Sequence, residues 1–187
     1  MNAINVADAP AVPWRNGGGV TRELLALPTS SDWDLRLSVA DIDSDGPFST
    51  FLNVPRTFAV IDGQGVLLTW PEKSLTVKVG DAPIVFDGSH PPVSHLLAGP
   101  VRDLNLMCRN GCAKMWSTTE PWTPSVGTFA GMFACVPGIW SDGLRSIAVA
   151  AFTLMWTNDA ESREWSFDPN FPDKQIGWWI SHEDVQQ

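Results

Sequence analysis

Three segments of the sequence place hydrogen-bonding side chains at every second position. They lie at 20–23 (VTRE), 35–40 (LRLSVA) and 102–109 (RDLNLMCR). Because side chains alternate across a β-strand, residues two apart share one face of a sheet. The first row is expected to continue into Leu25 and Leu27. The polar residues of the three rows are Thr21, Glu23, Arg36, Ser38, Asp103 and Asn105.

The residue types in these rows fit a site for a small organic anion. An arginine can hold a carboxylate through two parallel hydrogen bonds. Short amide, hydroxyl and carboxylate groups can satisfy one another in a partly buried pocket. A half-buried antiparallel sheet that turns its polar rows toward water is the alternative, and the rows alone leave it open.

The segment PWRNGGGVTREL, residues 13–24, contains three consecutive glycines, Gly17, Gly18 and Gly19. A phosphate-binding loop has Gly-Lys-Ser/Thr, or spaced glycines, at the start of a helix. The residues after Gly19 alternate like a strand instead. We therefore expect either backbone N–H groups that orient a ligand together with Asn16, or a bend where two backbones pass closely. Trp14 is expected to stack on a flat ligand or to pack in the core.

The sequence contains no recognisable metal or nucleophile motif. Its three histidines, His90, His95 and His182, form no His-x-His or His-Glu-x-x-His pattern. Cys108 falls on the apolar row of its strand, which disfavours a reactive thiolate. We therefore expect no metal, no cofactor and no catalytic residue. Glu23 and Asp103 are expected to stay ionised beside arginines and to hold the guanidinium groups in place.

Composition excludes several classes of partner. The chain has 187 residues, a formal net charge of -9, 44% hydrophobic and 18% charged residues. Nucleic-acid binding depends on many basic contacts, which this balance does not offer. No apolar run reaches the roughly 18 residues of a membrane span, and no signal peptide is visible at the start. We expect a cytoplasmic protein with reduced cysteines.

Short strands separated by turn residues predict an all-β fold. A Pro-rich junction at 118–127 suggests two modules within one compact chain, with approximate halves 1–119 and 120–187. The predicted strands are 20–27, 33–42, 57–61, 65–70, 74–79, 93–98, 101–109, 113–118, 127–136, 146–156, 163–167 and 175–180.

The ordered motifs resemble the HutD/Ves family. The resemblance begins with Trp14-Arg15-Asn16-Gly17-Gly18-Gly19-x-Thr21-x-Glu23. It continues through Arg-x-Ser-x-Ala, Gly-Pro-Phe-Ser, Arg-Thr and Asp-x-Asn-x-Met blocks and covers about the first 110 residues. Arg15 stands where the family often has Lys. Several blocks in one order are more specific than any single block.

This resemblance implies a double cupin-like β-barrel (a bicupin) that binds a small carboxylate without converting it. It also implies a role in tuning histidine utilisation, with urocanate or formylglutamate as ligand, although a related branch is described as stress-inducible. We expect Arg36 and Arg56 to contact the carboxylate. The candidates that match the family by position are Asn16, Thr21, Glu23, Arg36, Ser38, Arg56, Asp103 and Asn105.

Two alternatives to simple ligand binding stay open. The first is a metal-independent isomerase or hydrolase acting on a small carboxylate. The second is a regulator that acts through a pathway protein. The sequence also leaves open whether the chain forms a homodimer. Trp178 and Trp179 are expected to form such an interface or to pack in the core.

Overall fold

The computed structural model describes residues 1–170 and 177–183. The chain forms two compact units. We call Pro10–Asn110 the pocket unit, and Met1–Ala9 with Gly111–Gln187 the tryptophan unit. The helical structure in the described part of the chain is one 3-10 turn, η1 (Val6–Asp8). No helix in that part is both long and apolar enough to cross a membrane.

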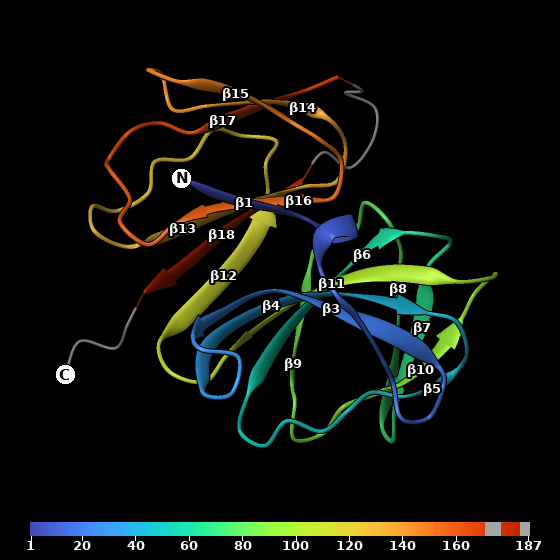
Figure 1. Cartoon of the computed structure of the whole chain (residues 1–187). Coiled ribbons are helices and arrows are strands. Elements are labelled where there is room, and N and C mark those ends of the chain that lie inside the picture. The colour runs from blue at the N-terminus through green and yellow to red at the C-terminus, as the bar shows by residue number, and fades with distance from the viewer. Residues whose placement is uncertain (171–176, 184–187) are drawn as a thin grey trace. The chain divides into compact units, whose positions relative to one another are not determined.

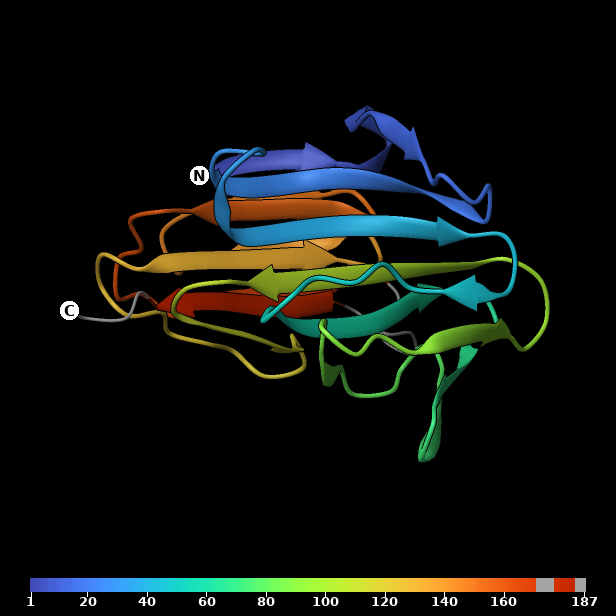
Figure 2. The same cartoon turned by 90° about the horizontal axis from the view of Figure 1, so that it is seen from below.

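The pocket unit contains two antiparallel sheets (Figure 1). The six-stranded sheet has the order β2 (Ala11–Pro13), β3 (Gly19–Pro28), β4 (Trp33–Ile42), β11 (Val101–Cys108), β6 (Pro55–Asp62) and β9 (Ile84–Asp87). The four-stranded sheet has the order β5 (Gly46–Pro47), β10 (Val93–Leu96), β7 (Val66–Trp70) and β8 (Lys73–Val77). In Figure 2, β3, β4 and β11 run alongside one another, as their pairing requires.

Apolar side chains from both sheets meet inside the pocket unit. Phe58 and Val60 of the six-stranded sheet belong to one buried cluster with Val66 and Leu68 of the four-stranded sheet. Burial of such side chains contributes about 25 cal/mol per Å² of apolar surface removed from water. This cluster forms one end of the interior of the unit, and the polar rows lie on the same inner face of β4 and β11.

The tryptophan unit also contains two antiparallel sheets. The five-stranded sheet has the order β1 (Asn2–Asn5), β16 (Thr153–Thr157), β13 (Phe129–Ala134), β18 (Gly177–Glu183) and β12 (Cys112–Ser117). The three-stranded sheet has the order β15 (Ser146–Val149), β14 (Gly138–Ser141) and β17 (Ser166–Pro169). β1 joins the C-terminal half of the chain because Asn2 pairs with Trp156 and Asn5 with Thr153.

Indole rings fill the interior of the tryptophan unit. Trp140 and Trp179 are fully buried, and Trp165 is almost so. The ring centroids of Trp140 and Trp165 are 5.1 Å apart at a nearly perpendicular angle, and those of Trp165 and Trp179 are 6.1 Å apart. Edge-to-face packing of this kind is a favourable arrangement for aromatic rings.

The all-β, antiparallel class predicted from the sequence is confirmed. Each sheet has two edge strands and is open rather than closed into a barrel. The predicted strand 146–156 is two strands, because the chain turns at Phe152, whose φ is 56°. Within the predicted strand 175–180, residues 175 and 176 lie outside the described residues. The sequence did not reveal β1, β2, β5, β9 or β14.

Candidate functional site

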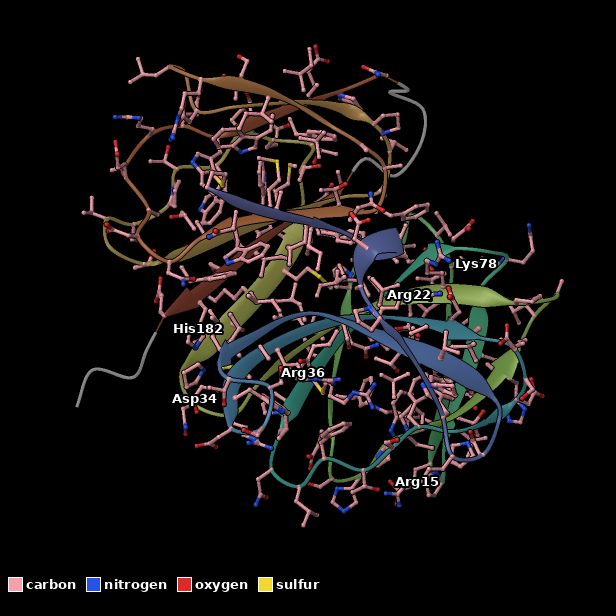
Figure 3. All side chains as sticks on the ribbon, viewed as in Figure 1. Arg15, Arg22, Asp34, Arg36, Lys78 and His182 are labelled. Atoms are coloured by element: carbon pink, nitrogen blue, oxygen red, sulfur yellow. The ribbon has the colours of Figure 1, made fainter. Side chains whose placement is uncertain are left out.

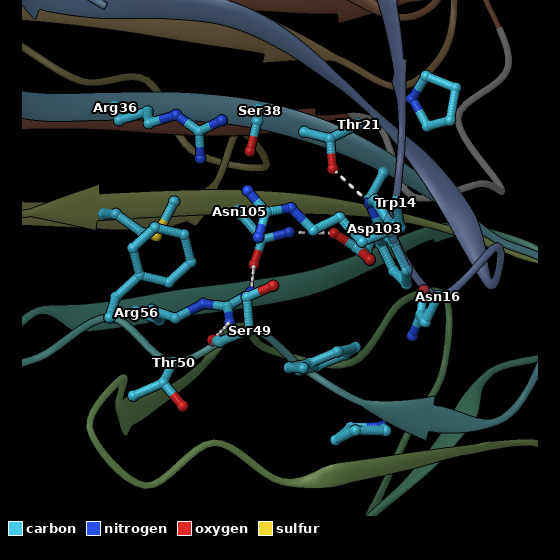
Figure 4. Close-up of a pocket in the computed structure, with 17 residues that line it drawn as sticks. Trp14, Asn16, Thr21, Arg36, Ser38, Ser49, Thr50, Arg56, Asp103 and Asn105 are labelled. Carbon is cyan, nitrogen blue, oxygen red and sulfur yellow. Dashed lines mark hydrogen bonds between the residues drawn. The ribbon is translucent and has the colours of Figure 1, made fainter. Parts of the chain in front are cut away.

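A cavity of about 740 Å³ opens into the pocket unit. Its walls come from β3, β4, β6 and β11 and from the segments around residues 13–16 and 47–51. The predicted residues that line it are Trp14, Asn16, Thr21, Arg36, Ser38, Arg56, Asp103 and Asn105. The further lining residues are Pro13, Arg15, Ala40, Pro47, Phe48, Ser49, Thr50, Phe51 and Met107. The structure therefore brings most of the predicted polar residues to one cavity (Figure 4).

Strand register explains this convergence. Asp103 of β11 lies opposite Ala40 of β4, and Asn105 lies opposite Ser38. Directly opposed residues in an antiparallel pair point to the same side of the sheet. Two residues farther along β11, Met107 lies between Arg36 of β4 and Arg56 of β6. The inner face thus has three successive cross-strand rows, which we call the levels of Asp103, Asn105 and Met107. Arg36 and Arg56 both lie at the level of Met107.

A β-bulge corrects one expectation for β3. The pairing with β4 shifts between Glu23 and Leu25, so that Leu25 lies opposite Leu37 instead of sharing the inner face with Glu23. A bulge adds one residue to a strand and reverses the alternation beyond it. The expectation that Leu25 and Leu27 continue the face of Thr21 and Glu23 is therefore wrong. Leu25 lies on the apolar face of the sheet, and both Leu25 and Leu37 are buried.

Arg36 is held by Glu23 and keeps its outer nitrogens available. Its Nε donates to Oε2 of Glu23 at 2.7 Å. Neither Nη atom of Arg36 has a hydrogen-bond partner among the residues that the structure describes. Glu23 does not line the cavity and acts on the site through Arg36. Arg22 lies on the opposite face of the sheet, where it forms an ion pair with Asp41 (Figure 3).

Arg56 is buried among aromatic rings. Its Cζ lies 5.2 Å from the ring centroid of Phe48, 5.6 Å from that of Phe51 and 5.1 Å from that of Phe86. One Nη donates to the carbonyl of Ser49 at 3.3 Å, and the other to Oδ1 of Asn105 at 2.7 Å. The buried Nε has no hydrogen-bond partner within the described part of the chain. Burial lowers the pKa of Arg56 to about 10, a value that leaves the group charged at neutral pH.

Asp103 departs from the expectation that it is ionised. The side chain is 1% exposed and accepts a hydrogen bond from Nδ2 of Asn105. Burial raises its pKa to about 8, and the charge of Arg56 only partly offsets this effect. The carboxyl group is therefore mostly protonated at pH 7. Desolvation outweighs the nearby arginine because Asn105 stands between the two groups.

The glycine loop lies behind the cavity wall. None of Gly17, Gly18 and Gly19 is among the lining residues. A Cβ added at Gly19 would meet the backbone oxygen of Asp41 at 2.2 Å, so only glycine allows the two strands to approach this closely. The N–H of Gly18 donates to Oδ1 of Asn16 at 3.1 Å. This loop fixes Asn16 at the rim of the pocket.

Trp14 forms part of the cavity wall above β3. Its Nε1 donates to Oγ1 of Thr21 at 2.7 Å, which satisfies the indole N–H and orients the ring. The ring also packs against the buried cluster of the pocket unit. Trp14 therefore packs in the core, as one expectation had it, and also lines the cavity, while stacking on a ligand stays a prediction.

The sequence reasoning missed the loop at 47–51. Phe48 and Phe51 flank Arg56, and Ser49 accepts its hydrogen bond. The segment GPFSTF carried a signal, since its Gly-Pro-Phe-Ser block was part of the family resemblance. Nothing in the alternation of a strand predicts that a loop will close over the site.

The histidines and cysteines of the described part of the chain lie outside this cavity. His90 contacts Asp87 at 3.1 Å and His95 contacts Asp45 at 3.0 Å, and these four side chains are well exposed. Cys108 is buried, and its Sγ lies 2.9 Å from the carbonyl of Asn110. Within the described part of the chain, no group of three or more His, Cys, Asp or Glu is placed to hold a metal ion. The cavity offers instead the guanidinium groups of Arg15, Arg36 and Arg56, together with hydroxyls, amides and one neutral acid.

Comparison with known proteins points to one family. Residues 6–136 match the sequence model of the family HutD. A Pseudomonas putida protein described as "Uncharacterized 21.2 kDa protein in hutC 3'region" is 36% identical over 110 residues, 57% of this chain and 57% of that protein. Protein Ves of Cronobacter sakazakii is 34% identical over 110 residues, 58% of this chain and 61% of Ves. The matched part thus spans less than two thirds of these relatives.

A solved structure supports the same fold along the chain. HutD from Pseudomonas fluorescens SBW25 is similar with a TM-score of 0.84 and 22% identity, and the match covers 99% of both chains. At this level of identity the likeness shows the fold and leaves the ligand to be argued from the pocket.

Proposed function

The chain belongs to the HutD family, and from this and its pocket we propose that it binds a small organic carboxylate reversibly and without converting it. The family is linked to histidine utilisation, and the Pseudomonas putida relative is named for the hutC 3' region. Urocanate and formylglutamate are the carboxylates that this link suggests. Binding of such an intermediate would let the protein sense or tune the pathway in the cytoplasm, as one chain with two cupin-like modules.

The pair Arg36 and Arg56 carries this proposal. Both line one cavity, and strand register places them on either side of Met107. Arg36 presents two Nη groups that have no hydrogen-bond partner among the described residues, and two such groups can hold a carboxylate through two hydrogen bonds. Arg56 supplies a buried charge whose position is fixed by Ser49 and Asn105. We assign direct contact to Arg36 and electrostatic attraction to Arg56.

The flat wall of the pocket supports a ligand with a planar part. Trp14, Phe48 and Phe51 line the same cavity as the arginines. Aromatic faces stack on planar groups and exclude water from the charged end of a ligand. The cavity wall also contains the hydrogen-bonding groups of Ser38, Thr50 and Asn105.

One observation favours a second candidate, a metal-independent isomerase or hydrolase. Asp103 is a buried acid in the cavity whose pKa of about 8 is suited to proton transfer near neutral pH. Among the described residues that line the cavity, no second carboxylate and no histidine is present to act with it as a base. Turnover of a bound acid would establish this candidate in place of simple binding.

Thermal unfolding with added ligands tests the proposal. A ligand at 100 times its Kd stabilises a protein by about 2.7 kcal/mol, which is roughly 5–11 °C for a chain of this length. We expect such a shift with urocanate or formylglutamate and no shift with histidinamide, which lacks a carboxylate. The absorbance spectrum of urocanate, followed over hours, is expected to stay constant, and a change would identify an enzyme.

Arg36→Gln is the decisive variant, with Arg22→Gln as its matched control. Glutamine at position 36 can still donate to Glu23 but cannot form two parallel hydrogen bonds to a carboxylate. The ligand-induced shift of the unfolding temperature should therefore disappear. Arg22 belongs to the same sheet but to its opposite face, and its replacement should preserve the shift. Equal shifts in both variants would overturn the assignment of the carboxylate to Arg36.

A further inference from the structure

The two ends of the pocket differ in chemistry. Arg36 and Arg56 share the level of Met107, whereas Asp103 shares the level of Thr21 and Ala40. Positions 103 and 107 are about 13 Å apart along the strand. The cavity therefore has a cationic end and an acidic end within one volume of about 740 Å³.

Asp103 has no direct ionic partner among the residues that the structure describes. Asn105 donates to Oδ1 of Asp103 and accepts from Arg56 at 2.7 Å, so one carboxamide separates the acid from the guanidinium (Figure 4). Asp103, Asn105 and Arg56 are all at least 94% buried. A carboxylate in this position would lack both water and an ion pair, and its neutral form is favoured.

The net charge around Asp103 can be balanced by one bound anion. The charged groups near it are Arg56 from β6, Arg36 from β4 with its partner Glu23 from β3, Arg15 at the exposed rim, and Asp41 on the opposite face of β4. Its uncharged neighbours include Thr21, Ala40, Asn105 and Val60. Glu23 neutralises Arg36, so the buried interior carries one net positive charge while Asp103 is protonated. It carries none once Asp103 ionises.

On the basis of the proposed function, we propose that the pocket binds a carboxylate together with a proton held on Asp103, and that it prefers a monocarboxylate whose far end carries a neutral hydrogen-bond acceptor. The carboxylate occupies the cationic end. The O–H of Asp103 then donates to the acceptor at the other end. A second ionised carboxylate there would lie beside an acid that has no cation next to it, and is disfavoured. Of the two ligands named in the proposed function, urocanate, a monocarboxylate, therefore fits this pocket better than formylglutamate, a dicarboxylate.

The pH dependence follows from the free pocket. Burial places the pKa of Asp103 at about 8 before binding, and a bound carboxylate in the same cavity raises it further. Affinity should therefore be constant below pH 7 and fall about tenfold between pH 7 and pH 9. At pH 8, binding should take up about half a proton, because about half of the free pockets have lost theirs.

Isothermal titration calorimetry with glutarate and its monoamide, glutaramate, tests both the preference for a neutral far end and the uptake of a proton on binding. The two probes have the same size and differ only in whether the far end is a carboxylate or a neutral amide. Glutaramate is expected to bind at least ten times more tightly than glutarate at pH 7. Titrations at pH 8 in buffers of different ionisation enthalpy count the protons that the wild-type protein takes up.

Asp103→Asn removes the titrating proton and keeps the size and hydrogen-bonding character of the side chain. Its affinity for glutaramate should be the same at pH 7 and pH 9, and it should take up no proton. Asp43→Asn is the matched control, because Asp43 is exposed and outside the lining. That variant should keep the pH dependence of the wild type. Should Asp103→Asn fail to fold, the proton count in the wild type decides.

The outcomes separate this inference from the proposed function. Glutaramate binding without proton uptake and with equal affinity at pH 7 and pH 9 overturns the proton coupling and leaves carboxylate binding intact. Tighter binding of glutarate overturns the preference for a neutral far end. If glutaramate, glutarate, urocanate and formylglutamate all fail to bind the wild type at pH 7, both proposals fall.

Discussion

The six-stranded sheet of the pocket unit turns Arg56, Asp103 and Asn105 toward its interior, whereas the five-stranded sheet of the tryptophan unit turns Met132 and Trp179 inward. Both units are pairs of antiparallel sheets. In one, polar side chains bond to one another around a cavity. In the other, indole rings fill the corresponding space between the sheets. The arrangement of strands therefore does not decide whether an interior is open, and the inward-facing residues do.

This difference separates packing from ligand binding. A buried polar network is stable only when its members satisfy one another, and a partly satisfied one costs free energy. The unpartnered Nε of Arg56 is such a cost in the pocket unit. Among the described residues of the tryptophan unit, the indole nitrogens of Trp140 and Trp178 also lack partners, but Trp140 gains large apolar contacts in the buried cluster around it.

The largest effect is expected from Trp140→Ala in the tryptophan unit. Trp140 is fully buried beside Trp165, so its loss leaves a cavity and should lower the free energy of unfolding by about 3–5 kcal/mol. Equilibrium unfolding in urea measures this. Trp140→Phe is the control, since it keeps a ring and removes the unpartnered N–H, and it should cost clearly less. If Trp140→Ala lowers the free energy of unfolding by less than about 1 kcal/mol, the interior of this unit is not tightly packed.

A smaller, pH-dependent effect is expected from Asp103→Asn in the pocket unit. Asp103 has a pKa of about 8 in the folded protein because of burial, and its ordinary value is 3.8. Between these values the unfolded chain has released the proton and the folded protein has kept it. The wild type should therefore lose stability relative to the variant as pH rises from 5 to 7.5, by at most about 1.4 kcal/mol per pH unit.

Urea unfolding of both proteins at several pH values measures this difference. Asp43→Asn, at an exposed position, should follow the wild type at each pH. A constant difference between wild type and Asp103→Asn across the range would mean that Asp103 is ionised in the folded protein, as the sequence reasoning expected.

The smallest effect on stability is expected from Arg56→Met. Methionine can occupy the space among Phe48, Phe51 and Phe86, and the cost of burying a charge disappears. The free energy of unfolding should change by about 1 kcal/mol or less, while the thermal shift with urocanate or formylglutamate is lost. A loss of several kcal/mol would show instead that Arg56 is a structural element, and would remove the contrast between the two units.

The inner faces of β4 and β11 could be predicted from the sequence. Arg36 and Ser38, and likewise Asp103 and Asn105, alternate with buried apolar residues, and these two strands pair without a shift in register. The same reasoning failed beyond Glu23, because no glycine or proline marks the bulge in β3.

The contacts that complete the site depend on packing between distant segments. The aromatic surroundings of Arg56 come from a loop and from β9, which alternation within β6 cannot reveal. The protonation of Asp103 was misjudged for a related reason. Proximity to arginine can be guessed from the residues, but the depth of burial that outweighs it depends on the folded cavity.

The pairing of β1 with β16 has a consequence for the order in which the chain folds. Asn2 of β1 pairs with Trp156, which is synthesised more than 150 residues after it. The pocket unit, in contrast, is continuous from Pro10 to Asn110 and can fold as its strands appear. Closing this long loop has to wait for β16, which slows completion of the tryptophan unit. Until then, β1 is an unpaired strand that a chaperone or a neighbouring chain can capture.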